Sequence, residues 1–263
     1  MQFLIVVAAE QGHHDAMNAE TPKAAELSLP QAFLLLATND KDGKPEVPVF
    51  ALRTTVAVAI LAELDLLGAI ELQGKHVRAT GTVPQTDFQH ELELIRGKSR
   101  PHTPKGWVAI LEGRAEVRRV YEGMASQGIV EHVGEKHLGR FRPVRYPHKD
   151  HAPEEALLKK IEAALSGASD LKVPDAAPAD AGTATAGAVD AAMSESKAPE
   201  ATTPDVRTTA LIALLQAAGL FGKLFPDADR SRANELARDY WPTRAVEDEL
   251  RLIRLAEEEA ATL

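Results

Sequence analysis

The sequence predicts a mainly α-helical protein, built as a single helical domain with short β-hairpins. Aromatic residues make up only 5% of the chain, so the core must consist chiefly of Leu, Ile, Val and Ala, a composition that favours helices over a β-sandwich or barrel. Several segments also repeat apolar residues every three or four positions, the spacing of a helix with one face against a core. Two of the predicted helices are followed by a glycine and a hairpin pattern, which is the order of elements in a winged-helix unit.

Composition and charge exclude several classes of protein. The 263 residues contain no cysteine, which excludes disulfide scaffolds, thiolate zinc sites, iron–sulfur clusters and cysteine nucleophiles. The net charge of −9 argues against a globally basic nucleic-acid binder. Residues 1–9 are apolar but lack the basic start of a secretory signal, and no uninterrupted apolar run approaches the roughly 18 residues of a membrane span. We therefore expect a cytoplasmic protein, with residues 1–22 as an N-terminal extension that begins with a strand or a docked arm.

The first half of the chain carries clear helix signals. Ser28 and Gln31 form a capping-box pattern with a proline in the first turn, ahead of a helix over residues 31–38. A turn at 39–43 ends that helix. A long helix is predicted over 51–67, because it carries an apolar stripe at helical spacing and ends at a glycine.

The elements that follow repeat one plan. Residues 69–82 read as a hairpin, and helices are predicted over 87–95, around Trp107, and over 115–126. The last of these leads into residues 128–131 and 141–146, which read as a second hairpin. A repeated helix–hairpin unit is typical of winged-helix proteins, although the match between the two copies is short.

The C-terminal half contains an insertion between further helices. Residues 167–203 are rich in Ala, Pro, Gly, Ser, Thr and Asp and lack Ile and aromatic residues, so they cannot bury enough apolar surface to offset the entropy of ordering. We expect a disordered linker there. Further helices are predicted over 153–166, 207–221, 229–239 and 243–261. Residues 23–166 and 204–263 are then expected to form one domain around the insertion.

Motifs of known chemistry are absent from the sequence. It contains no phosphate-binding loop, dinucleotide-binding glycine pattern, nucleophile elbow or His-Glu-x-x-His motif. Asp87 and Glu91 have helical spacing, but a capping Asp followed by a solvated Glu is the commoner arrangement. His148 and His151 are three residues apart without a nearby carboxylate arranged as a third ligand. The sequence therefore predicts no catalytic residue, no cofactor, no metal ion and no enzyme.

One segment departs from the acidic character of the chain. Residues 96–149 contain twelve basic and five acidic side chains, a net charge of +7. Such a segment can present a positive face to an anionic surface, where each basic residue contributes about 1 kcal/mol. Arg114 and Arg118 lie four residues apart on one helix face, a spacing suited to phosphate oxygens. The competing interpretation is a solvated basic face that pairs with acidic residues elsewhere.

Taken together, the motifs resemble those of the Golgi phosphoprotein 3 family and its bacterial relatives. The Ala-rich helix at 57–70 is similar to that family's most distinctive segment, a helix of the pattern Leu-x-Glu-Leu-x-Leu-x-Gly-x-Ile. The opening helix at 27–37, the Gly-Ile-Val at 128–130 and the helix at 207–215 also fit. Further matches occur at Pro84, Asp87, Leu94, Ile95 and Trp107. The resemblance covers residues 27–165 and 204–262.

The resemblance implies a mainly helical domain and a non-enzymatic, peripheral membrane adaptor that binds an anionic phosphoinositide, phosphatidylinositol 4-phosphate, at the inner face of a membrane. It also implies protein clients and a role for the 69–82 hairpin in membrane contact and self-association. Composition favours a bacterial member. An ungapped match puts Pro48 at the family's headgroup-binding Trp and Ala57 at its Arg. The predicted lipid headgroup site therefore consists of the following residues: Arg118, Arg119, Arg114, Arg53 and Phe50.

Two other functions are compatible with the sequence. A winged-helix-like nucleic-acid-binding protein would use the repeated plan and the basic segment. Against it, the helix over 51–67 carries one base and two acids on a largely apolar surface, which suits a core and not a DNA groove. Nucleic acid is therefore an unlikely partner on the sequence alone. A protein-interaction scaffold without a small ligand is the third interpretation.

Overall fold

A computed structural model describes residues 26–134, 143–166, 205–238, 240–248, 250–252 and 255. The predicted N-terminal extension at 1–22 and the predicted insertion at 167–203 lie outside these residues, as do residues 256–261 at the end of the predicted helix at 243–261. Within them the chain is mainly helical with one two-stranded hairpin, as the sequence predicts.

The elements follow the predicted order with small shifts at their ends. The N-terminal half contains α1 (Leu29–Leu36), α2 (Val49–Leu66), β1 (Ile70–Gln73), β2 (His76–Ala79), α3 (Gln89–Gly97), α4 (Pro104–Leu111) and α5 (Arg114–Ser126). The C-terminal half contains α6 (Ala152–Ser166), α7 (Val206–Ala217), α8 (Phe221–Leu224), α9 (Arg230–Ala237) and α10 (Trp241–Arg244).

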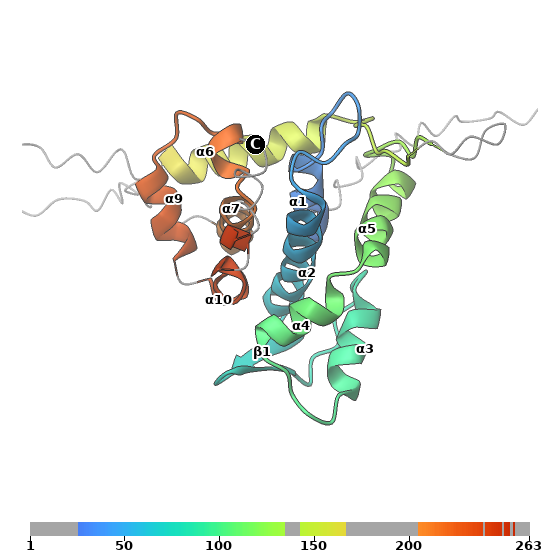
Figure 1. Ribbon diagram of the computed structural model, residues 1–263, viewed down its shortest axis with the longest axis vertical. Helices are drawn as coiled ribbons and strands as arrows, with labels where there is room; N and C mark the ends of the chain where they lie inside the picture. Colours follow the sequence, from blue (N-terminus) through green and yellow to red (C-terminus); the bar gives the residue numbers. More distant parts are fainter. Residues whose placement is uncertain are drawn as a thin grey trace, which may run out of the picture.

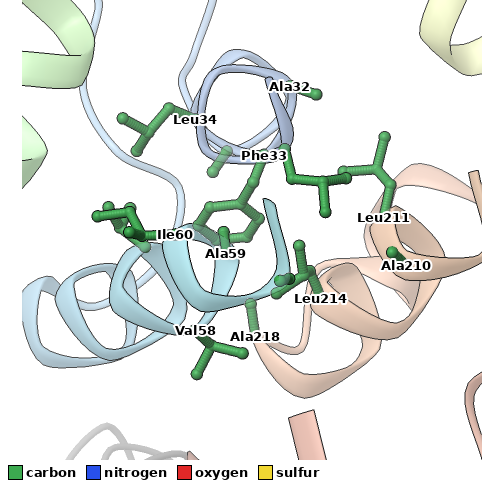
Figure 2. Packing of buried hydrophobic residues seen from close by; sticks show 14 of the residues in the cluster. Ala32, Phe33, Leu34, Val58, Ala59, Ile60, Ala210, Leu211, Leu214 and Ala218 are labelled. Carbon is green, nitrogen blue, oxygen red and sulfur yellow. The ribbon is translucent and has the colours of Figure 1, made fainter. Parts of the chain in front are cut away.

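The core is built around α1, α2 and α7. Every residue of α1 is buried, and α2 is buried along nearly its whole length from Ala51 to Leu64. Figure 2 shows the Phe33 side chain of α1 pointing onto α2, with Leu211 and Leu214 of α7 to one side of it. Small residues such as Ala59 on α2 allow these helices to approach closely. The segment predicted as a helix over 207–221 is apolar on most sides because most of it forms α7, which lies in the core.

The remaining helices flank this core on two sides. Figure 1 shows α3, α4 and α5 on one side of α1 and α2, and α7, α9 and α10 on the other, with α6 lying across one end. The contacts agree with this view, because α5 packs on α1 and α2, whereas α6 and α9 both pack on α7. The basic 96–149 segment thus lies largely on the α3–α5 side.

The first predicted hairpin is present and the second is only partly so. β1 and β2 pair antiparallel in the register Ile70 to Ala79, and Gly74 takes a positive φ of 61° in the turn. The segments after α5 contribute two isolated bridges, Val130 to His148 and Val133 to Arg145, and form no ladder among the described residues. Residues 135–142, where the second hairpin would turn, lie outside the described chain.

A buried carboxylate joins α1, α2 and α7. Glu63 on α2 is 5% exposed and accepts two hydrogen bonds from Arg207 of α7, at 2.6 Å from Nη1 and 3.0 Å from Nη2. The same carboxylate accepts the backbone N–H of Leu29 at 2.8 Å, in the first turn of α1. Arg207 follows residues 167–203 in the sequence and Glu63 precedes them, so this contact supports the prediction of one domain on both sides of that segment, which stays a prediction.

Replacing Arg207 tests this arrangement. We expect Arg207→Met to reduce the free energy of unfolding by about 3 kcal/mol, because the Glu63 carboxylate is left buried without its cation. Urea denaturation followed by circular dichroism measures the change. Lys160→Ala is the matched control, since its ammonium pairs with Glu26 at 3.6 Å between two exposed side chains. Equal stability of the two variants would contradict the proposed role of Glu63.

Candidate functional site

The first turn of α2 presents apolar side chains to solvent. Val49 is 54% exposed, and Phe50, at 67%, has the largest exposed fraction among the large apolar side chains described before α7. Pro48 is the N-cap residue and no side chain caps the helix, so its first backbone N–H groups are left for solvent or a ligand. The protein therefore keeps an apolar tip at the positive end of α2, a helix that is otherwise largely buried.

Arg53 lies one turn beyond Phe50 and joins α2 to the α4–α5 junction. Its Nε and Nη2 donate to the Glu112 carbonyl at 3.1 and 2.6 Å, at the C-terminal cap of α4. Thr54 donates to the Glu112 carboxylate at 3.0 Å. The Arg53 guanidinium carbon also lies 5.8 Å from the centre of the Phe50 ring. Arg53 therefore positions the junction while part of its guanidinium faces the apolar tip.

Arg114 begins α5 only two residues after Glu112. It is exposed, and it makes no hydrogen bond or ion pair with any residue that the structure describes. Two residues span at most about 7 Å of chain, so the first turn of α5 starts close to the carbonyl that Arg53 holds. The Glu116 carboxylate folds back over Gly113, the N-cap of α5. Phe50, Arg53 and Arg114 are thus brought to one region by the structure.

The other two predicted headgroup ligands are engaged with carboxylates. Arg118 is 67% exposed and pairs with Glu122 at 2.6 Å along the helix, a contact that contributes little at the surface. Its pKa is raised by this hydrogen bond and by the charge of Glu122. Arg119 instead lies 2.7 Å from Glu91 of α3, whose side chain is only 1% exposed. Arg119 therefore compensates a buried charge and serves the packing of α3 on α5.

Helix α5 is fixed to α1 by a buried hydroxyl pair. Thr38 donates to the Leu34 carbonyl at 2.6 Å, so Tyr121 must donate its own proton across the 2.7 Å contact to the Thr38 hydroxyl. Burial raises the pKa of Tyr121 to about 12, which keeps this donor protonated at physiological pH. The Tyr121 ring stacks on Tyr146 with centroids 4.3 Å apart.

A shallow hollow beside α5 is lined in part by the carboxylates of Asp87 and Glu122. Their negative charges disfavour the binding of an anionic ligand in this hollow.

Two positions, one just before α2 and one within it, carry residues other than the Trp and Arg with which the resembled family binds headgroups. Pro48 caps α2, and Ala57 is fully buried in the core. A cation at position 57 could not reach solvent in this packing. Arg53 is four residues earlier and therefore lies on the same face of the helix, one turn nearer to the exposed end. The arginine of α2 thus lies one turn nearer to the exposed end of the helix than the position matched to the family's arginine.

The family itself is settled by comparison with known proteins. The family model of Golgi phosphoprotein 3 (GPP34) matches residues 29–253. The chain belongs to the Golgi phosphoprotein 3 family. A comparison with curated proteins gave no significant match. Among the described residues of this family member, no helix combines the length and hydropathy that crossing a bilayer requires.

Sequence reasoning missed a second group of polar side chains. Asp40, His148, His151 and Glu154 lie together, with one ligand-type atom of each within 4.8 Å of the others. The expectation that no carboxylate is arranged beside the two histidines was wrong, because Glu154 lies only three residues after His151 and the fold adds Asp40 from the turn after α1. Burial lowers the pKa of His148, and the hydrogen bond and charge of Glu154 with the charge of Asp40 more than offset this, so the pKa is raised overall.

Measurements of unfolding stability can distinguish the role of Arg119 from that of Arg118. Arg119→Ala should reduce the free energy of unfolding by about 1–2 kcal/mol, because the Glu91 carboxylate stays buried without a partner. Arg118→Ala should leave the urea midpoint unchanged. Adding Glu91→Gln to Arg119→Ala should recover part of the loss. A midpoint that is the same for the Arg119 and Arg118 variants would show that Arg119 has no structural role.

Proposed function

We propose that this protein is a non-enzymatic, peripheral membrane adaptor that binds anionic phospholipid headgroups through the first turns of α2 and α5. By family resemblance the headgroup is phosphatidylinositol 4-phosphate, and the surface is the inner face of a membrane. The observation that carries the proposal is the position of the exposed Val49 and Phe50 beside Arg53, with Arg114 at the next helix start.

An apolar tip flanked by cations suits the boundary between headgroups and acyl chains. Burial of an aromatic side chain in the membrane contributes about 1.5–3 kcal/mol, and each basic side chain near an anionic surface adds about 1 kcal/mol. Neither the apolar insertion nor the attraction of the charges alone gives stable attachment to a membrane, but the two together give reversible binding. Arg53 and Arg114 supply charges that no carboxylate neutralises by direct contact within the described chain, whereas Arg119 is committed to Glu91.

The hairpin at 69–82 is a second proposed contact, for self-association or for the membrane. Leu72 on β1 is 37% exposed, and Val83, just after the hairpin, is 65% exposed. Protein clients are proposed on the family resemblance. The burial of α2 along nearly its whole length argues further against the nucleic-acid interpretation, because such a helix cannot enter a DNA groove.

Liposome sedimentation tests the lipid proposal. The vesicles contain phosphatidylcholine alone, with phosphatidylserine at matched charge, or with phosphatidylinositol 4-phosphate. Val49→Ser with Phe50→Ser should weaken binding by about tenfold or more, because the apolar tip no longer inserts. Arg114→Ala should weaken it by about fivefold, the effect of one surface charge. Raised salt should also weaken binding, since exposed charges are screened.

Matched controls separate these effects from general changes in charge or exposure. Val206→Ser removes an apolar side chain of α7 that is 61% exposed, and Lys159→Ala removes an exposed cation of α6. Both should sediment as the unaltered protein does. Equal binding by all variants would place the lipid site elsewhere, and no sedimentation with any anionic vesicle would refute lipid binding itself. A gel-shift titration on duplex DNA at physiological salt would reveal the nucleic-acid alternative.

A further inference from the structure

Three separate chain segments meet at a group of two imidazoles and two carboxylates. Asp40 lies in the turn after α1, His148 in the segment that follows α5, His151 just before α6, and Glu154 in the first turn of α6. His148 Nδ1 is 3.2 Å from a Glu154 oxygen and 3.3 Å from an Asp40 oxygen. His151 Nδ1 is 3.7 Å from the other Asp40 oxygen.

These separations match those of a four-coordinate metal centre. When each bond from the metal to its ligand is about 2.0–2.2 Å long, the ligand atoms of a tetrahedral zinc site lie about 3.3–3.6 Å apart. Only small side-chain shifts would bring the four atoms, all within 4.8 Å of one another, around one ion. Two carboxylates with two neutral imidazoles carry a charge of −2, which a divalent cation neutralises.

The backbone holds the segments in place without help from the four side chains. The Asp40 carbonyl accepts the His148 N–H at 3.1 Å, and the Gly43 carbonyl accepts the Tyr146 N–H at 3.1 Å. Gly43 has a positive φ of 64°, and a Cβ there would lie 2.3 Å from the Pro147 nitrogen. This close approach needs glycine. The cluster is therefore set by a preformed scaffold, which lowers the cost of ordering ligands around an ion.

The burial of the ligands differs in a way that suits metal entry. The His148 side chain is 0% exposed and Glu154 is 15% exposed, whereas Asp40 and His151 are 45% and 55% exposed. An ion would thus reach the buried pair through the exposed pair. Imidazole nitrogen is a poor ligand for Ca²⁺ and Mg²⁺, which prefer oxygen, and a good one for Zn²⁺ and related ions.

We propose that Asp40, His148, His151 and Glu154 form a binding site for a divalent transition-metal ion, with Zn²⁺ as the best fit. The ion would join the turn after α1 to the start of α6. Its role is structural, because all four ligands come from the protein and a tetrahedral ion keeps no open position.

Metal binding by the full-length, untagged chain tests the proposal. After treatment with a chelator, the protein is dialysed against Zn²⁺ and its metal content is measured. We expect one retained Zn²⁺ per chain and a rise in the melting temperature with Zn²⁺ but not with Ca²⁺ or Mg²⁺. Bound Co²⁺ should give the intense visible bands of a four-coordinate site.

Substitution of the exposed ligands identifies the site. His151→Ala and Asp40→Asn should each weaken retention of Zn²⁺ by at least about tenfold, while the melting temperature of the metal-free protein changes little because both side chains are largely exposed. His90→Ala, on an exposed position of α3, should retain the ion, as should the double variant His13→Ala with His14→Ala. Failure of the unaltered protein to retain Zn²⁺, or retention that only the His13 and His14 changes abolish, would overturn the proposal.

Discussion

The Glu63 carboxylate lies where α1, α2 and α7 meet, and the packing of the whole core depends on its neutralisation. Its three hydrogen bonds reach the first turn of α1 and the guanidinium of Arg207. Burying a charged carboxylate to this extent destabilises the folded protein unless a cation pairs with it. The pairing in turn fixes α7 against α1 and α2, and hence where α6 and α9 can pack. The flanking α3, α4 and α5 then cover the opposite side of α1 and α2.

The basic segment serves both the fold and the proposed lipid contact. Within the segment, Arg119 neutralises Glu91; outside it, Arg53 of α2 holds the end of α4 through a carbonyl. These arginines stabilise the junction on which Arg114 and the apolar tip are displayed. The interpretation that the +7 segment pairs with acidic residues holds for Arg118 and Arg119, whereas Arg114 is exposed and contact of the segment with an anionic surface stays a proposal. A net charge counted along the sequence does not distinguish the two groups, because the pairing depends on how the helices cross.

Local sequence signals predicted the elements well and the tertiary contacts poorly. The Ser28–Gln31 cap and the glycine at 68 mark the ends of helices through short-range hydrogen bonds and backbone conformation, which a sequence displays directly. The pairing of Arg119 with Glu91 joins two helices, and that of Asp40 with His148 joins residues more than a hundred positions apart. Such contacts depend on the packing of several segments together. For the same reason, sequence spacing could name Arg53 and Arg114 as candidates without showing which donors were already used.

The central position of α7 has a consequence for synthesis on the ribosome. The helix that completes the core is encoded after residue 205, whereas its partners α1 and α2 emerge within the first third of the chain. Until α7 emerges, the faces of α1 and α2 that meet Leu211 and Leu214 lack their cover, and the Glu63 carboxylate lacks its cation. At about 5–20 residues per second, the interval between α2 and α7 lasts on the order of ten seconds. The nascent chain thus exposes an unfinished apolar surface during that time, and chaperones that bind apolar segments would meet it there.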